Sequence, residues 1–250
     1  MKAIISDIHA NLEALRAVLE DARQLGASEI ICLGDVVGYG PNPKECIDLA
    51  MDFDVVLRGN HEQALMTEFE GSDFNDRAKN SLNWTREQLS PLNEDREANV
   101  KRWDFLDRLP KTHTEGNVLY VHGTPRDPIL EYVYARDVLR PQKLRSIFEQ
   151  IEWLCFCGHS HSPGIWTSDM VYLTPREVKY RYRPVKEKTI VNVGSVGQPR
   201  DRDPRATYVL FDGTRIAYRK VEYDARITAQ KIRSIPEVDP FLGERLLEGR

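Results

Sequence analysis

The sequence predicts an α/β protein in which parallel strands alternate with helices. Short apolar runs typical of buried strands recur along the chain, beginning at residues 3–5 and 30–33. Between these two runs, residues 11–25 place apolar side chains on one face at helical spacing, with Asn at the N-cap and Gly after the last turn. An Asn-Pro pair then introduces a second helix at 43–51. Strand, helix and strand in this order predict a parallel sheet.

Later apolar runs extend the predicted sheet and change its direction. Further strands are predicted at 55–57, 118–121, 153–156, 189–193, 207–211 and 216–221. Asp212 and Gly213 separate the last two runs, which is typical of a hairpin, so the sheet should be partly antiparallel.

Two polar helices are predicted in the middle of the chain, at 76–89 and 94–109. Their narrow apolar stripe consists of Leu82, Leu89, Val100, Trp103 and Leu106. We interpret them as a helical insertion, at about 70–112, that packs on the sheet of a single domain spanning residues 1–250.

Composition excludes a disordered chain and a membrane protein. Hydrophobic residues make up 41% of the 250 residues, close to the globular norm. The longest stretch without Asp, Glu, Lys or Arg, residues 153–168, is shorter than the about 20 residues of a membrane-spanning helix. The apolar run after Lys2 is too short for a secretory signal, so we expect a cytoplasmic protein. A net charge of −4 indicates no general affinity for nucleic acid.

The cysteines fit a reducing compartment. Three of them lie in apolar runs, the fourth lies on a predicted helix, and no C-x-x-C occurs, so we expect reduced, buried thiols. These residues are Cys32, Cys46, Cys155 and Cys157. An alternative zinc site would use Cys155, Cys157, His159 and His161. That site is disfavoured, because a straight strand cannot wrap four side chains around one ion.

Acidic, amide and imidazole side chains follow five of the predicted strands. Since the carboxyl ends of strands line one edge of an open α/β sheet, we expect these side chains to converge. The candidate ligands are Asp7, His9, Asp35, Asn60, His122, His159 and His161. Oxygen and imidazole ligands without thiolate suit divalent Mn, Fe or Zn. Seven ligands exceed the three of one open catalytic site and favour two ions that share a carboxylate, an arrangement used in phosphoester hydrolysis.

The order of these motifs resembles a known family. D-x-H, G-D, G-N-H-[DE], H and G-H-x-H follow one another from Asp7 to His161, as in the calcineurin-like metallophosphoesterases. The strings SDIHANLEAL, GDVVGYGPNP and VNVGSVGQPRD further resemble the small prokaryotic phosphodiesterase-like branch. The resemblance implies a two-sheet αββα sandwich with its metal site at the carboxyl ends of the strands. Many members read G-D-x-x-D, whereas Gly38 stands here at the position of the second acidic residue.

The resemblance also implies roles for individual residues. One ion would be held by Asp7, His9, Asp35 and His161, and the other by Asp35, Asn60, His122 and His159. Asp35 would bridge the two ions. His61 would act as general acid or stabilise the leaving oxygen.

The implied activity is hydrolysis of a phosphodiester, a nucleotide pyrophosphate or a phosphomonoester by a hydroxide that bridges the two ions. Mn is favoured among Mn, Fe, Zn, Ni and Co, and the expected partner is a small phosphorylated substrate, such as a nucleotide. A phosphoprotein phosphatase is an alternative, suggested by the string RGNHE at 58–62. A non-catalytic scaffold on the same fold is another, although such scaffolds lose ligands or the substrate-facing histidine.

Three further residues are candidate substrate contacts, each with a structural alternative. Arg58 could bind phosphate or tie its strand to a carboxylate. Arg200 could bind phosphate or pair at the surface with Asp201 or Asp203. Asn11 could contact phosphate besides capping its helix.

Two other features are assigned to the surface. Residues 178–183 alternate aromatic and basic side chains, which fits either a nucleic-acid platform or an edge strand whose charges prevent aggregation; we favour the edge strand. His113 belongs to no motif and lies in a polar stretch.

Overall fold

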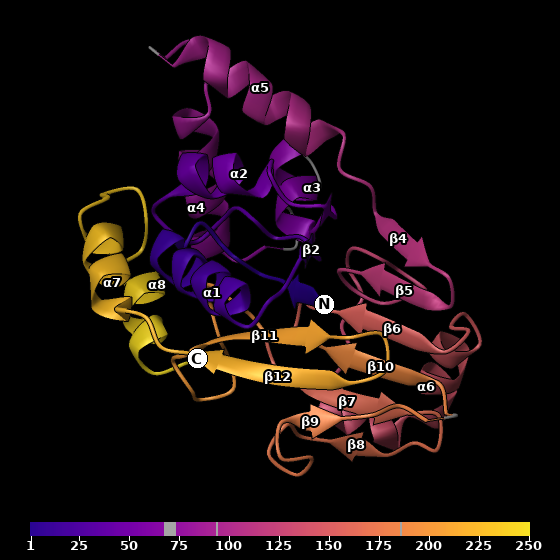
Figure 1. Ribbon diagram of the computed structural model, residues 1–250. Helices are drawn as coiled ribbons and strands as arrows, with labels where there is room; N and C mark the ends of the chain where they lie inside the picture. The colour runs from indigo at the N-terminus through magenta and orange to yellow at the C-terminus, as the bar shows by residue number, and fades with distance from the viewer. Residues whose placement is uncertain (68–73, 94, 186) are drawn as a thin grey trace.

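The computed structural model describes residues 1–67, 74–93, 95–185 and 187–250 and shows two facing sheets with helices on their outer sides (Figure 1). In the first sheet the strand order is β3-β2-β1-β11-β12-β9. Its strands are β1 (Lys2–Ile5), β2 (Glu29–Cys32), β3 (Val55–Val56), β9 (Arg181–Tyr182), β11 (Ala206–Phe211) and β12 (Ile216–Val221). β1, β2 and β3 are parallel, and β11 and β12 form the predicted antiparallel hairpin.

The second sheet has the order β4-β5-β6-β10-β7-β8. Its strands are β4 (Thr112–Glu115), β5 (Val118–Val121), β6 (Leu154–Cys157), β7 (Gly164–Thr167), β8 (Tyr172–Leu173) and β10 (Thr189–Asn192). β5, β6 and β10 run parallel, whereas β4, β7 and β8 pair antiparallel with their neighbours.

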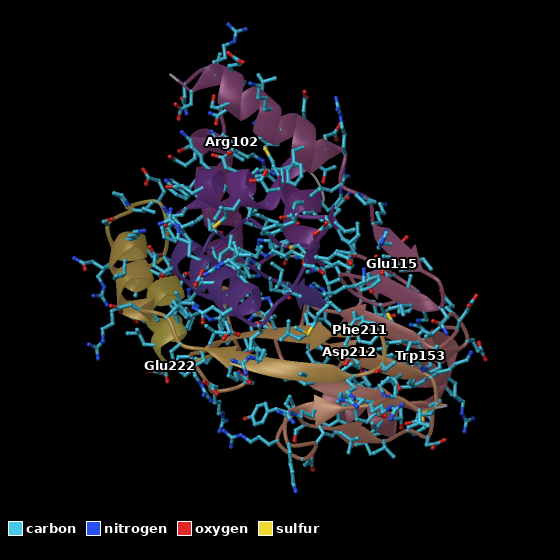
Figure 2. All side chains as sticks on the ribbon, in the orientation of Figure 1. Arg102, Glu115, Trp153, Phe211, Asp212 and Glu222 are labelled. Atoms are coloured by element: carbon cyan, nitrogen blue, oxygen red, sulfur yellow. The ribbon has the colours of Figure 1, made fainter. Side chains whose placement is uncertain are left out.

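Alternation along the strands builds the layers. Ile4 points into the space between the sheets, whereas Ala3 and Ile5 face outward. The ring centroid of Phe211 on β11 lies 5.2 Å from that of Phe156 on β6 and 6.4 Å from that of Trp153. Phe211 and Trp153 are labelled in Figure 2. The two-sheet αββα sandwich expected from the sequence is therefore confirmed.

Helices cover both outer faces. On the first sheet lie α1 (Leu12–Gln24), α2 (Pro43–Ala50) and α3 (Asn60–Met66); on the second lie η2 (Ala135–Leu139) and α6 (Pro141–Phe148). No helix of the described residues is long and apolar enough to cross a membrane. The four cysteines are free and buried, as expected.

The helical insertion packs differently from the prediction. α4 (Asp76–Gln88) and α5 (Arg96–Asp107) lie mainly against α2 and α3 rather than on the sheet, because those helices already cover it. Val100, which the predicted apolar stripe includes, is 43% exposed. Arg102 of the same helix is buried instead and donates bonds of 2.8 and 2.6 Å to the carboxylate of Asp48. Residues 70–73 and 94 of the predicted insertion lie outside the described residues.

The C-terminal segment adds α7 (Ala225–Arg233), α8 (Phe241–Glu244) and η3 (Arg245–Leu247), to which the sequence pattern assigned no element. In the run at 178–183 only β9 forms, at the edge of the first sheet, with Lys179, Arg181 and Arg183 exposed. Tyr180 and Tyr182 pack on the core instead of forming an open aromatic surface, so the edge-strand interpretation is confirmed.

Candidate metal centre

All seven candidate ligands are buried in one cluster in the loops that follow β1, β2, β5 and β6 and at the start of α3. The backbone of these loops is strained. Five of the seven have left-handed φ angles between 48° and 64°: Asp7, His9, Asp35, His159 and His161. This region costs a residue with a β-carbon roughly 1 to 2 kcal/mol, and such strain concentrates at functional sites.

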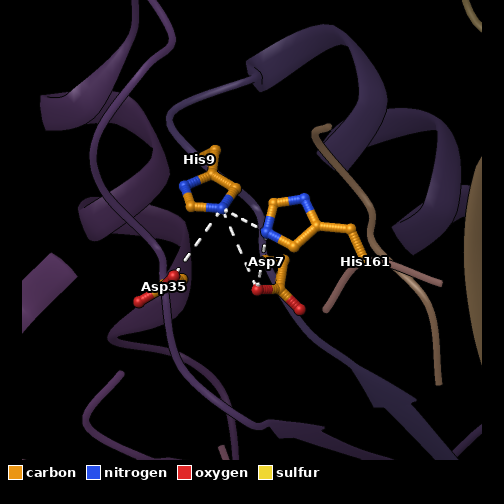
Figure 3. A group of neighbouring side chains, drawn as sticks. All are labelled: Asp7, His9, Asp35 and His161. Atoms are coloured by element: carbon orange, nitrogen blue, oxygen red, sulfur yellow. Dashed lines mark hydrogen bonds and ion pairs between the residues drawn. The ribbon is translucent and has the colours of Figure 1, made fainter. Parts of the chain in front are cut away.

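The first group consists of Asp7, His9, Asp35 and His161 (Figure 3). The Nε2 atoms of His9 and His161 lie 3.1 Å apart. His161 Nε2 is 3.2 Å from Asp7 Oδ1, and His9 Nε2 is 3.7 Å from Asp35 Oδ2.

Hydrogen bonds on the far side of each ring set the tautomer. His9 Nδ1 lies 3.1 Å from the Val37 carbonyl, and His161 Nδ1 lies 2.6 Å from the Gln198 carbonyl. A carbonyl can only accept, so each Nδ1 carries the proton and each Nε2 turns a lone pair inward. The buried Asp7 Oδ1 accepts no hydrogen bond from the residues that the structure describes. Acceptors that face one another in this way fit a cation between them.

The second group consists of Asp35, His122 and His159, joined by Asn60. His122 Nε2 lies 3.0 Å from Asn60 Oδ1, 3.1 Å from His159 Nδ1 and 3.5 Å from Asp35 Oδ2. The opposite ring nitrogens lie 3.1 Å from the carbonyls of Leu33 and Leu130. Asp35 Oδ2 therefore faces both groups, and the second group is again made of acceptors.

Burial tunes these ligands for metal binding. Desolvation lowers the pKa of His122 to about 4, and it holds the pKa values of His9 and His159 well below the usual range. The imidazoles are therefore neutral and able to bind a metal near pH 7. Burial, together with the charges of Glu62 and Asp7, raises the pKa of Asp35, so this carboxylate needs a nearby cation to stay ionised. Both donor sets fit divalent ions.

Glu62 organises the loops around Asp35, a role that the sequence analysis did not identify. Its buried carboxylate accepts N–H bonds from Asp35 at 2.8 Å, Gly59 at 2.9 Å and Val37 at 3.1 Å. A β-carbon at Gly59 would lie 2.1 Å from Asp35 Oδ1, so glycine permits the two loops to approach. The acidic last position of G-N-H-[DE] was the available signal for this role.

His61 stands beside the cluster, with Nε2 4.0 Å from Asp35 Oδ2. Its ring packs between those of Tyr39 and Phe74, at centroid distances of 4.6 and 4.9 Å. A β-carbon at Gly38 would lie 2.1 Å from His61 Nδ1. The His61 ring therefore occupies the space that an acidic side chain at position 38 would need. His61 Nδ1 has no hydrogen-bond partner among the described residues.

An open cavity of about 480 Å³ lies next to both groups. It is lined by Asp35, Tyr39, Asn60, His61, Phe74, Asn75, Ala78, Leu130, Tyr132, His159, His161, Arg200 and Arg245. The candidate ligands thus form part of the wall of a space that could hold a small molecule.

A sequence model of the calcineurin-like phosphoesterase superfamily domain matches residues 1–215. The chain belongs to this superfamily. It is 38% identical to an uncharacterized protein of Methanocaldococcus jannaschii, over 100% of this chain and 98% of that protein. It is 35% identical to a metallophosphoesterase from Sphaerobacter thermophilus, whose crystal structure matches with a TM-score of 0.83 over 100% and 98% of the two chains. A hypothetical protein from Pyrococcus horikoshii shares the fold, with 22% identity, 100% and 99% coverage and a TM-score of 0.74.

In this member of the calcineurin-like phosphoesterase superfamily, Arg200 lines the cavity rather than the outer surface. Its backbone N–H bonds to the His161 carbonyl at 3.2 Å, and its guanidinium donates to Gln198 at 2.8 Å. The alternative of a surface ion pair is wrong, because Asp201 pairs with Lys220 at 2.6 Å and Asp203 pairs with Arg205 at 2.7 Å.

The structure does not bring Arg58 to the cavity. Its guanidinium donates to the carbonyls of Leu106 and Asp107 and lies 3.9 Å from the carboxylate of Asp107, at the end of α5. Arg58 is therefore a structural residue, and the expectation that it contacts phosphate is wrong. The loop before α3 lies against α5, which turns this side chain away from the ligands.

Asn11 is likewise a structural residue. Its Oδ1 accepts from Ala14 N at 3.1 Å and from Thr228 at 3.0 Å, and its Nδ2 donates to Gly197 O at 2.8 Å and Tyr223 at 3.2 Å. The expected N-cap is present. These bonds use all the donors and acceptors of the Asn11 amide, so the expectation that Asn11 contacts phosphate is wrong.

The alternative zinc site does not form. Cys155 and Cys157 lie in the apolar cluster under α6, whereas His159 and His161 belong to different ligand groups. His113 lies on edge strand β4, where its ring contacts Glu115 at 3.2 Å, away from the centre.

Proposed function

We propose that this chain is a dinuclear metal-dependent phosphoesterase that hydrolyses small phosphorylated substrates. One observation carries the proposal: two acceptor-only groups share Asp35 Oδ2 and border a cavity whose wall contains Arg200. Membership in the calcineurin-like phosphoesterase superfamily supports it. Two divalent ions bound by these groups would polarise a phosphoryl group and activate water, the usual chemistry of such pairs.

The residues around the cavity would divide the remaining work. Arg200 would bind phosphoryl oxygens through charge-assisted bonds and orient the substrate. His61 would donate a hydrogen bond to the leaving oxygen. Burial and the positive charges nearby hold the pKa of His61 well below its usual range, which favours a neutral ring that donates one hydrogen bond.

The alternatives differ from this proposal in what they need. A scaffold needs no complete ligand set, yet all seven candidate ligands and His61 are present and clustered. A protein phosphatase must hold an extended peptide, whereas the cavity has the volume typical of small-molecule sites.

The test is a metal and substrate panel. Protein stripped by a chelator is reloaded with Mn, Fe, Co, Ni, Zn or Mg and assayed on nitrophenyl mono- and diesters, dinucleoside polyphosphates and a phosphopeptide. We expect about two bound ions per chain and hydrolysis of small esters, with Mn favoured. Asp35→Ala should lose both bound metal and turnover, whereas Asp52→Ala, at an exposed site, should lose neither.

Two outcomes would contradict the proposal. Two bound ions without turnover of any ester would favour the scaffold. Turnover of the phosphopeptide alone would favour the protein phosphatase.

A further inference from the structure

Arg245 brings a second guanidinium to the cavity from outside the matched domain. The superfamily match ends at residue 215, whereas Arg245 belongs to η3 in the C-terminal segment. This arginine lines the same cavity as Asp35, His61 and Arg200. The C-terminal segment thus adds a residue to a site whose metal-ligand motifs all lie within the matched domain.

Packing fixes the position of this segment. Trp84 of α4 forms an apolar cluster with Ile232 of α7 and with Leu242 and Leu246, which flank Arg245. Gly243 sits so close to α7 that a β-carbon there would lie 2.9 Å from Ala229 Cα. These contacts hold η3 on the helices that surround the cavity, so Arg245 is presented by an ordered element.

A backbone bond also joins the end of the chain to the turn that carries Arg200. The N–H of Arg202 donates to the carbonyl of Gly249 at 2.8 Å. The two arginines therefore belong to segments that are tied together beside the cavity.

No Asp or Glu carboxylate lies within 4.0 Å of either guanidinium among the described residues. Arg200 donates to the Gln198 amide oxygen, and Arg245 donates through Nε to the main-chain oxygen of Arg250. Burial and the charge of Arg200 lower the pKa of Arg245 to about 10, so Arg245 remains positive near pH 7. Two like charges on one partly desolvated wall repel each other, and an anion in the cavity would relieve that repulsion.

The positive charge at the cavity would exceed the charge needed to bind one phosphate. Two divalent ions held by residues that include Asp7 and Asp35 would, together with Arg200, already offset the charge of a phosphoryl group. Arg245 is surplus to that group. A dianionic phosphate can accept bonds from two guanidinium forks, which makes a second phosphate the natural occupant of this part of the cavity.

We propose that Arg245, together with Arg200, binds a second phosphate of the substrate and so selects phosphoesters that carry a further phosphate beyond the one hydrolysed. The inference rests on the proposed phosphoesterase function. It assigns specificity to a residue of the C-terminal segment rather than to the metal ligands.

The test compares ligands that differ only in a second phosphate. Alkyl monophosphates and alkanediol bisphosphates of increasing spacer length are measured as competitive inhibitors of p-nitrophenyl phosphate turnover. A bisphosphate gains about twofold from having two equivalent ends, so only a larger advantage reports a second subsite. At the best spacer length we expect the bisphosphate to bind roughly tenfold or more tightly than the monophosphate, because charge-assisted bidentate bonds are strong.

Variants locate the subsite. Arg245→Gln should reduce the bisphosphate advantage to about the twofold statistical factor, and Arg245→Lys should keep part of it because lysine lacks the planar fork. Arg250→Gln is the matched control, since this arginine lies near Phe241, as Arg245 does, but does not line the cavity. Arg245→Met preserves the apolar stem if the Gln variant melts early.

The outcomes separate the two proposals. If the parent protein turns over no ester, the proposed function fails. If it turns over p-nitrophenyl phosphate but no spacer exceeds the twofold factor, or the advantage survives in Arg245→Gln and Arg245→Met, only the second-phosphate subsite is overturned.

Discussion

The Nε2 atoms of His9 and His161 lie 3.1 Å apart, although both rings already hold their proton on Nδ1 against a backbone carbonyl. A hydrogen bond between the two Nε2 atoms would need a proton that neither has. Protonation of either ring in the absence of metal would place an extra positive charge in a buried site. The folded protein therefore favours neutral histidines, which is the form that binds a metal ion.

This preference predicts the pH dependence of the metal-free protein. The folded pKa of His122, about 4, is below the unfolded value of about 6.5, so the folded state binds fewer protons between these limits. Stability is fully present above about pH 6.5 and is lost as the pH falls toward 4. Thermal melts in chelator across this range should show the decline. His122→Asn should make the decline shallower, and His113→Gln, outside the centre, should leave it unchanged; equal slopes in all three proteins would contradict the assignment.

Glu62→Gln should weaken both the fold and metal binding. The carboxylate accepts three backbone N–H bonds, whereas the amide of Gln offers one oxygen and turns an NH₂ toward donors. We expect a loss of about 1.5 to 3 kcal/mol in unfolding free energy and a roughly 10-fold or greater loss in metal affinity. Urea unfolding and metal titration measure the two effects. Glu152→Gln, at an exposed position, is the control; a Glu62→Gln protein with unchanged metal affinity would show that the loops hold without this contact.

Gly38→Ala should impair turnover through His61. Gly38 has a φ of 85°, and Gly213 has a φ of 94° but no atom within 4 Å of the point where a β-carbon would lie. Both Ala variants should therefore lose about 1 kcal/mol of stability from backbone strain. Only Gly38→Ala must displace His61, so only this variant should lose turnover while it retains its metals. Matched activity in the two variants would refute the steric role of Gly38.

His61→Ala should keep both ions and lose about 100-fold or more in kcat, the usual loss when a hydrogen-bond donor to a developing oxyanion is removed. The side chain lies 4.0 Å from Asp35 and belongs to neither ligand group. A leaving group of low pKa, such as nitrophenolate, should reduce the defect because it needs less stabilisation of its negative charge. Elemental analysis together with kinetics on alkyl and nitrophenyl esters makes the measurement. An emptied site in His61→Ala would mean that His61 is a ligand.

Arg200→Ala should lower kcat/KM by roughly 10 to 150-fold with metal content unchanged, and Arg200→Lys should recover only part of the loss. The Arg200 Nε is buried and has no hydrogen-bond partner among the described residues, so it can donate to a bound phosphate. Arg58→Ala is the control, since that side chain binds the end of α5 and should affect stability rather than kcat/KM. Turnover by Arg200→Ala within about twofold of the parent would remove Arg200 from the site.

Local pattern in the sequence was sufficient for the frame of the site. Helical spacing and capping predicted α1 with Asn11 as its N-cap, and the Asp-Gly pair predicted the hairpin of β11 and β12. Convergence of the ligands followed from strand order, because the carboxyl ends of parallel strands meet at one edge. The strands β4, β7 and β8 were not predicted, since runs of two to four residues carry little periodicity. Helix α7 does carry a helical period, with Ala225, Thr228, Ala229 and Ile232 buried on one face, although this helix was not predicted from the sequence.

Tertiary structure decided the partner of each polar side chain. The Asn11 amide bonds to Gly197, Tyr223, Thr228 and the first turn of its own helix. The guanidinium of Arg58 bonds to the end of α5. Arg245 lines the cavity although it lies far along the chain from the ligands. On α5, Arg102 rather than Val100 is buried. Periodicity and motif spacing report which face of an element is buried. Which donor meets which acceptor across more than a hundred residues depends on how the layers pack, and only the folded chain contains that information.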